Sequence, residues 1–185
     1  MKNIKVIFIH GNGGGTAKDN WFPYLKRELE KIGIKVIAKN FPDPVLARAK
    51  YWLPFLKKLG ADENTVLIGH SSGAIAALRF AENNKILGSV LVGGYYTDLG
   101  DEGEKKSGYF DESWNWEKIK NNQKWIIQFN SQDDPWIPIA EARYINKMLN
   151  TEYHEYEKEG HFGADKYYPE FPKLVEVLKA KLEAD

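Results

Sequence analysis

The chain has 185 residues, in which 26 Lys and Arg balance 26 Asp and Glu, and it contains no cysteine. The length suits one domain with a buried core, and the zero net charge argues against nucleic acids or anionic membranes as partners reached through bulk charge. The lack of cysteine excludes disulfides, thiol nucleophiles and cysteine metal sites.

Apolar runs typical of strands alternate along the chain with patterns typical of helices. The expected strands are Ile4–Ile9, Ile34–Ala38, Thr65–Gly69, Leu87–Val92, Lys124–Phe129 and Glu152–Glu157. The expected helices are Trp21–Lys31, Pro44–Leu59, Ser72–Asn83, Pro138–Leu149 and Pro169–Leu182. This alternation predicts a single α/β domain over residues 1–185, with a mostly parallel six-stranded sheet and helices on both faces. The first apolar run is too short for a signal peptide core or a membrane span, so we expect a cytoplasmic protein.

A glycine-rich segment, Gly11–Thr16, follows the first expected strand. It fails as a dinucleotide fingerprint, because Thr16 occupies the third glycine position and the second strand ends without an acid for a ribose. It also lacks the Gly-Lys-Ser/Thr of a phosphate loop. A backbone N–H of this loop is suited to hold a developing oxyanion; Asn12 is the preferred donor and Gly13 the alternative. The plainer interpretation is a flexible strand-to-helix turn.

The most informative segment is Thr65–Ala77, in which an apolar run leads through Gly-x-Ser-x-Gly at residues 69–73 into a small-residue helix pattern. This is the pattern of a nucleophile elbow, in which a serine, here Ser71, sits on a sharp strand-to-helix turn with its oxygen exposed. The glycines allow the helix to pack close to the strand. The N–H of Ser72, at the positive end of the helix, is the second expected oxyanion donor.

The longest connection, Thr97–Asn122, is charged in its first part and aromatic in its second. About 25 residues are too few for a full cap domain but enough for a partial lid. We expect its aromatic side chains either to line an acyl or side-chain pocket or only to anchor the loop to the core. The candidate substrate-binding residues are Gly13, Tyr95, Tyr109, Phe110, Trp114, Trp136 and Phe162.

A serine nucleophile needs a general base. In chains with a nucleophile elbow the triad follows the order Ser, Asp or Glu, His, which excludes His10 and His70. His154 lies within an alternating strand pattern, so a structural or solvated role is expected for it. His161 remains, in a loop directly after that strand, where a catalytic base is expected in an open parallel sheet.

The base needs an orienting acid, and Asp133 and Asp134 both follow the fifth expected strand. Two adjacent carboxylates cannot both face one imidazole, so one of them is expected to be a turn or cap residue. Asp134 is favoured, because its Asp-x-x-Ile-Pro spacing to Pro138 is familiar at the acid position of α/β-hydrolases. The alternative is that both aspartates only cap the next helix.

Seven segments spread over nearly the whole chain carry a resemblance to a known family. They are residues 10–15, 38–44, 52–55, 68–77, 107–110, 116–120 and 133–135. In these segments the chain resembles the α/β-hydrolase superfamily, and within it the retinoblastoma-binding protein nine type of serine hydrolases. The resemblance implies a three-layer α/β-hydrolase fold without a full cap domain, the strand order 2-1-3-4-5-6, and a triad that maps onto Ser71, Asp134 and His161.

One departure from the family is informative. The Leu-x-Cys-x-Glu segment behind the family name reads Leu-Gly-Ala-Asp-Glu at residues 59–63, without the cysteine. Binding of the retinoblastoma protein is therefore not expected.

Together these features predict a serine hydrolase that cleaves a small ester, or an amide or peptide bond, through an acyl-enzyme. Neither a metal nor an organic cofactor is expected, and the expected partner is a small-molecule substrate rather than a nucleic acid or a membrane. The alternative is a protein-interaction module on a hydrolase fold, with weak or incidental esterase activity and its aromatic loop as the contact surface. The presence of all three triad residues favours the enzyme.

Overall fold

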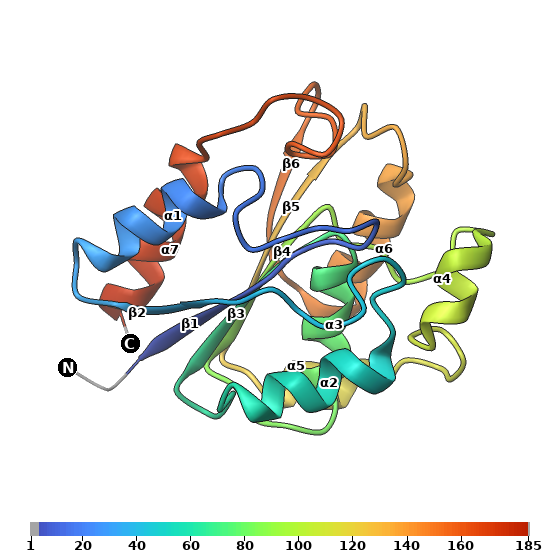
Figure 1. The fold of residues 1–185 in the computed structure, drawn as a ribbon, viewed down its shortest axis with the longest axis horizontal. Helices are drawn as coiled ribbons and strands as arrows, with labels where there is room; N and C mark the ends of the chain where they lie inside the picture. Colours follow the sequence, from blue (N-terminus) through green and yellow to red (C-terminus); the bar gives the residue numbers. More distant parts are fainter. Residues whose placement is uncertain (1–3, 185) are drawn as a thin grey trace.

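The computed structural model describes residues 4–184, within which six strands form one parallel sheet (Figure 1). The strands are β1 (Lys5–Ile9), β2 (Lys35–Ala38), β3 (Thr65–His70), β4 (Gly88–Val92), β5 (Trp125–Ser131) and β6 (Glu152–Tyr156). Their spatial order is β2-β1-β3-β4-β5-β6, and each neighbouring pair is parallel. The predicted sheet and the strand order implied by the resemblance are both confirmed.

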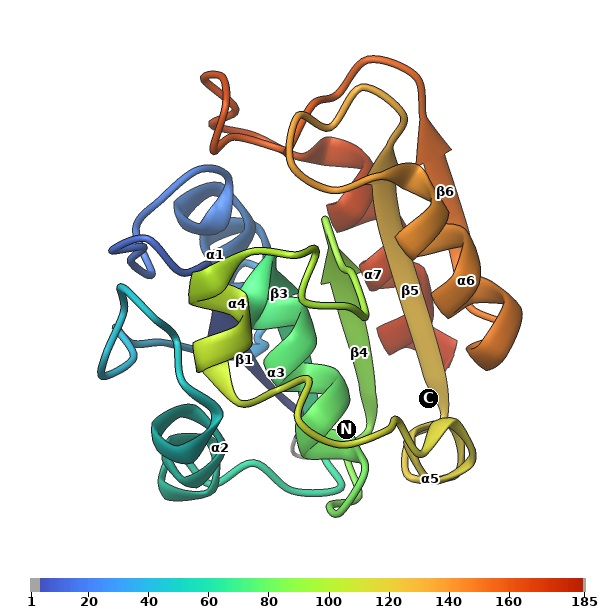
Figure 2. The same cartoon turned by 90° about the vertical axis from the view of Figure 1, so that its right-hand side faces the viewer.

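Helices cover both faces of this sheet. They are α1 (Phe22–Glu30), α2 (Ala49–Lys58), α3 (Ser72–Ala81), α4 (Glu102–Ser107), α5 (Trp116–Asn121), α6 (Ile139–Leu149) and α7 (Pro172–Ala184). Successive side chains of a strand point to opposite faces, so Val6 and Phe8 pack with α1 and α7, whereas Ile7 and Ile9 pack with α2 and α3. Figure 2 shows α3 and α6 in front of the sheet and α7 behind it.

The predicted helix Pro44–Leu59 begins later than expected, at Ala49. Asp43 has a φ of 52° and its carboxylate accepts hydrogen bonds from the backbone N–H and the guanidinium of Arg48. Those bonds hold residues 43–48 in a turn, which competes with the helix. The short helices α4 and α5 were not predicted at all within the 97–122 connection.

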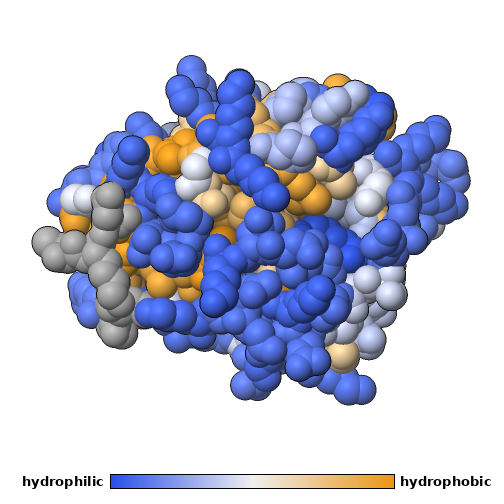
Figure 3. Space-filling model, turned by 90° about the horizontal axis from the view of Figure 1, so that it is seen from below, coloured by the Kyte–Doolittle hydropathy of each residue, from blue (hydrophilic) through white to orange (hydrophobic). Residues whose placement is uncertain are grey.

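The face seen from below is mostly hydrophilic, with apolar side chains visible in patches between the polar ones (Figure 3). None of the helices in the described part of the chain is long and apolar enough to cross a membrane.

Since β1 lies between β2 and β3, the chain leaves β1 on one side for β2 and later returns on the other side for β3. The loops after β1 and β3 therefore meet at the carboxyl edge of the sheet, where a crevice is expected.

Candidate active site

Ser71 lies on the turn between β3 and α3, with backbone angles φ 56° and ψ −124°. A positive φ is unfavourable for a residue with a side chain and persists only where surrounding contacts hold it. Here the Ser71 N–H donates to the Val92 carbonyl at 2.9 Å, and the Ala74 N–H donates to the Ser71 carbonyl at 2.8 Å. This is the backbone geometry that a nucleophile elbow requires.

Two glycines flank Ser71 because there is no space for a side chain at either position. A Cβ added at Gly69 would collide with the backbone of Gly73, and one added at Gly73 would collide with the carbonyl of Ile9. These collisions show how closely the start of α3 approaches β1 and β3. The Gly-x-Ser-x-Gly pattern is thus explained by packing as well as by the turn itself.

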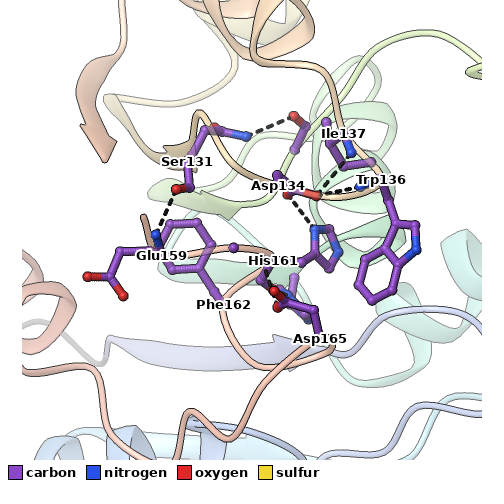
Figure 4. A network of polar contacts seen from close by, with 12 residues as sticks. Ser131, Asp134, Trp136, Ile137, Glu159, His161, Phe162 and Asp165 are labelled. Carbon is purple, nitrogen blue, oxygen red and sulfur yellow. Dashed lines mark hydrogen bonds and ion pairs between the residues drawn. The ribbon is translucent and has the colours of Figure 1, made fainter. Parts of the chain in front are cut away.

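His161 and Asp134 form a short, buried hydrogen bond (Figure 4). Nδ1 of the imidazole donates to Oδ2 of the carboxylate at 2.6 Å, and the two side chains are only 3% and 1% exposed. The other carboxylate oxygen accepts the backbone N–H groups of Trp136 and Ile137, both at 3.0 Å. A carboxylate held in this way keeps the imidazole proton on Nδ1, which leaves Nε2 as the basic nitrogen.

The adjacent Asp133 turns away from the imidazole and supports the loop that carries it. Its Oδ1 accepts the Ser131 hydroxyl at 2.6 Å and the Gly160 N–H at 2.8 Å. These bonds hold the pKa of Asp133 below its ordinary value, with the Ser131 hydroxyl as the largest cause. Of the two predicted candidates for the acid, the structure therefore brings Asp134, and not Asp133, to His161.

Further contacts fix the backbone and the ring of His161. Its N–H donates to Asp165 Oδ1 at 2.8 Å, and its carbonyl accepts Nε2–H of His70, also at 2.8 Å. Burial lowers the pKa of His70 to about 3, so this second histidine is neutral at ordinary pH. A Cβ at Gly93 would lie 2.9 Å from Cε1 of His161, so the glycine leaves the space that the imidazole occupies.

The glycine-rich loop lies against Ser71. A Cβ added at Gly11 would come within 3.3 Å of the Ser71 Cβ. The N–H of Gly13 donates to the Val45 carbonyl at 3.0 Å and is thus engaged outside the site. Of the two oxyanion donors predicted in this loop, Asn12 is the better candidate for that reason.

A cavity of about 850 Å³ joins these groups at the carboxyl edge of the sheet. Ser71, His161 and the glycine-rich loop line it, and so do Tyr95 and Trp136 among the aromatic residues predicted to bind substrate. The Trp136 and His161 rings lie nearly perpendicular to each other, with 5.0 Å between centroids, while 51% of Trp136 remains exposed. This indole therefore shields one side of the imidazole at the mouth of the cavity.

Four other predicted pocket residues pack into the core instead. Tyr109 and Phe162 are at most 1% exposed and belong to the two core clusters on either face of the sheet. Phe110 and Trp114 are partly buried and pack against the cluster around α3. For these four side chains, the alternative interpretation of core anchors describes the structure better than a pocket wall.

The anchoring has a specific cause in Arg79, a buried residue of α3. Its guanidinium donates to the carbonyls of Tyr109 at 2.7 Å and Glu112 at 2.6 Å. It also lies 3.6 Å from the centroid of the Trp114 ring and pairs with Glu82 at 2.9 Å. The second half of the 97–122 connection is therefore pinned to α3, whereas its first half reaches the cavity through Leu99, Asp101 and Glu104.

Sequence reasoning assigned no role to His10, which also lines the cavity. Its Nε2 accepts the Phe41 N–H at 2.9 Å, so Nδ1 carries the proton and donates to the Gly11 carbonyl at 2.8 Å. Burial lowers the pKa of His10, which favours this neutral form. The sequence signal for this role was the position of His10 directly before the glycine-rich loop, because a residue there can hold the start of that loop.

Comparisons with known proteins identify the family to which the chain belongs. The family model described as Serine hydrolase matches residues 6–180. Serine hydrolase RBBP9 of Rattus norvegicus is 45% identical over 181 residues, which cover 96% of this chain and 95% of the rat protein. YdeN of Bacillus subtilis (strain 168) is 30% identical over 183 residues, which cover 94% of each chain.

Solved structures share the fold. The crystal structure of the ydeN gene product from B. subtilis matches with a TM-score of 0.88 at 27% identity, covering 97% of this chain and 99% of that one. An alpha-beta serine hydrolase homologue from Coxiella burnetii matches with a TM-score of 0.64 at 17% identity, covering 98% and 86%. The second likeness concerns the fold alone. The chain has the α/β-hydrolase fold and belongs to the serine hydrolase family.

Proposed function

We propose that the protein cleaves a small ester, or an amide or short peptide bond, through an acyl-enzyme formed on Ser71. The observation that carries the proposal is the buried hydrogen bond of 2.6 Å between His161 and Asp134, on the same cavity as Ser71. Family membership supports a hydrolase in general, and this geometry supports the particular set of residues.

In the proposed mechanism, Nε2 of His161 takes the proton of the Ser71 hydroxyl as its oxygen attacks the carbonyl carbon of the substrate. Asp134 stabilises the imidazolium that forms. The backbone N–H groups of Ser72 and Asn12 bind the oxyanion of the tetrahedral intermediate. His161 then returns the proton to the leaving group, and a water activated by the same imidazole releases the acyl group from Ser71.

The substrate class is proposed from the size of the site. Small-molecule sites usually have volumes of about 300–1,000 Å³, and the cavity here, at about 850 Å³, falls within that range. A half-exposed indole, Trp136, stands at its mouth. These features favour a small ester or amide with access from solvent over a buried, long acyl chain.

A serine-directed fluorophosphonate tests the proposal. We expect one adduct, on Ser71 by peptide mass mapping, and turnover of 4-nitrophenyl acetate. Ser71→Ala should abolish labelling and lower kcat by about 10⁴–10⁶-fold, because the residue forms the covalent intermediate. Ser113→Ala is the matched control, since Ser113 is an exposed serine of the 97–122 connection.

An adduct on Ser72, or ester turnover that survives Ser71→Ala, would contradict the assignment. A folded wild-type protein with neither adduct nor turnover would instead favour the interaction module on a hydrolase fold.

A further inference from the structure

A carboxyl group on α4 reaches the glycine-rich loop from 92 residues away in the sequence. Oε1 of Glu104 accepts a hydrogen bond from Nδ2 of Asn12 at 2.7 Å, and Glu104 is only 7% exposed. The helix that carries it, α4, is capped at its N-terminus by Asp101, whose carboxylate accepts the N–H groups of Gly103 and Glu104. Figure 1 shows this helix at the right-hand edge of the molecule, on the connection that follows β4.

The same carboxyl group also neighbours Tyr95, which contacts Ser72, the residue that carries the second expected oxyanion donor. The Tyr95 hydroxyl shares a hydrogen bond of 3.1 Å with the Ser72 hydroxyl, and Tyr95 is 1% exposed. Burial raises the pKa of Glu104, and the neighbouring Tyr95 hydroxyl opposes part of that rise. Glu104 thus lies between Asn12, to which it is hydrogen-bonded, and Tyr95, whose hydroxyl is hydrogen-bonded to Ser72.

The burial of the Glu104 carboxyl group is costly. Among the residues that the structure describes, Glu104 Oε2 and the Tyr109 hydroxyl are buried without a hydrogen-bond partner. A buried polar atom in that state lowers the stability of the fold. A polar group retained at such a cost needs an explanation, and the contact with Asn12 offers one.

The backbone of the glycine-rich loop is held at Gly13 and Gly14, whose N–H groups donate to the carbonyls of Val45 and Pro44, and at Gly11, whose carbonyl accepts from His10. None of these bonds uses the N–H of Asn12. Residues 11–15 contain four glycines and one side chain, that of Asn12. Cβ atoms added at Gly13 and Gly14 would meet nothing within 4 Å, and both residues have positive φ. Such a segment has a large conformational entropy, so a donor on it is preorganised only if something outside the loop fixes it.

We infer that Glu104 is a positioning residue, which holds Asn12 and thereby fixes the backbone N–H of the glycine-rich loop where the oxyanion develops. The inference rests on the proposed function. Glu104 contacts neither the reacting atoms nor the serine, and it acts through the loop. Oxyanion donors must lie at their final positions before the reaction, since their contribution depends on preorganisation.

The test compares Glu104→Ala and Glu104→Gln with 4-nitrophenyl acetate as the substrate. Loss of one complete oxyanion donor costs about 10²–10³ in kcat, so a misplaced donor in Glu104→Ala should cost about 10–100-fold, with KM changed less than about threefold. Glu104→Gln keeps an acceptor oxygen for Asn12 and should recover kcat to within about threefold of wild type. Glu102→Gln, on the exposed side of the same helix, is the matched control.

The same hydrogen bond is then removed from the loop side. Asn12→Ala keeps its backbone N–H, and it should lower kcat by a similar factor of about 10–100. The double variant should lose no more than the worse single variant, because both remove one interaction. This arm keeps the inference testable if Glu104→Ala does not fold.

Melting curves on every variant give the folded fraction. The inference is overturned if kcat per folded molecule is unchanged in Glu104→Ala and Asn12→Ala, if the losses appear in KM alone, or if the double variant shows the product of the two single losses. Ser71→Ala separates this failure from that of the proposed function. If Ser71→Ala is inactive while both positioning variants are normal, only the positioning role fails.

Discussion

The two sides of the cavity are built differently. On the side of β5 and β6, Asp134 and His161 are held by several hydrogen bonds of 2.6–3.0 Å, including those to the backbone. On the opposite side, the first half of the 97–122 connection reaches the glycine-rich loop through the hydrogen bond from Asn12 to Glu104.

The difference suggests a division of roles. A base and its orienting acid must be held within tenths of an ångström, and dense hydrogen bonding gives that rigidity. A cavity wall that contacts only the variable part of a substrate needs a less rigid position. We therefore expect changes on the first side to alter rate. In the first half of the connection, we expect Glu104 to act on rate through Asn12, and the cavity-lining Leu99 to affect substrate choice.

The largest expected effect concerns the side of the cavity formed by β5 and β6, which carries Asp134 and His161. Asp134→Asn should lower kcat by about 10³–10⁴-fold, because the amide no longer selects the imidazole tautomer with its proton on Nδ1. Asp133→Asn should lower it by about tenfold or less, since Asp133 supports the backbone of the His161 loop. Steady-state ester hydrolysis on equal folded fractions measures both, and the reverse order of the two losses would exchange the roles assigned to these aspartates.

The next effect concerns the anchored half of the connection. Arg79→Met should lower the free energy of unfolding by about 3 kcal/mol, because it leaves Glu82 and two backbone carbonyls without their buried partner. Arg27→Met on the surface of α1 is the matched control and should change it by less than about 1 kcal/mol. Urea unfolding curves measure the difference. Equal values for the two variants would mean that the connection is not pinned to α3.

Much of the fold was predictable because its signals are local. Each buried strand is a short apolar run, and the elbow around Ser71 is fixed by a pattern of five residues. The residues at the ends of β5 and β6 were chosen by chain order and loop position, and the structure brings Asp134 and His161 together. Their catalytic roles stay a prediction.

What the sequence did not reveal depends on contacts between distant segments. The helix α4 is short and polar, and nothing in its residues indicates that Glu104 is buried against Asn12. The aromatic residues Phe110 and Trp114 were suitable for a pocket or for the core, because composition does not say which way a side chain points. The placement of this aromatic segment depends on Arg79. Its hydrogen-bond partners are backbone carbonyls, which no sequence pattern identifies.

A smaller effect comes from His70, which supports the carbonyl of His161. Its pKa falls from 6.5 to about 3 on burial, so the folded protein keeps His70 neutral where the unfolded chain binds a proton. The stability that the neutral form provides is complete above pH 6.5 and is lost as the pH falls from about 6.5 toward 3. One proton corresponds to a slope of about 1.4 kcal/mol per pH unit.

His70→Asn retains a donor for the His161 carbonyl but has no titratable group. Between pH 6.5 and pH 5, its free energy of unfolding should therefore fall by about 1–2 kcal/mol less than that of the wild type. Urea unfolding at the two pH values measures this, and His10 cancels because it is present in both proteins. Identical pH dependence in the two proteins would show that His70 is not held neutral by burial.

The smallest effect separates the two halves of the connection directly. Leu99 lines the cavity, whereas Phe110 packs against the core. A pocket contact discriminates between substrates by about 1–3 kcal/mol per methylene. Leu99→Ala should therefore shift the ranking of kcat/KM for 4-nitrophenyl esters toward longer acyl chains, by about fivefold or more between acetate and hexanoate. Phe110→Ala should leave that ranking unchanged and lower the melting temperature, because it creates a gap beside the core.

Fluorophosphonate labelling of Ser71 should persist in both variants, since neither residue contacts the Asp134–His161 pair. If Phe110→Ala reorders the ester series and Leu99→Ala does not, the second half of the connection selects the substrate and the division between the two halves is wrong.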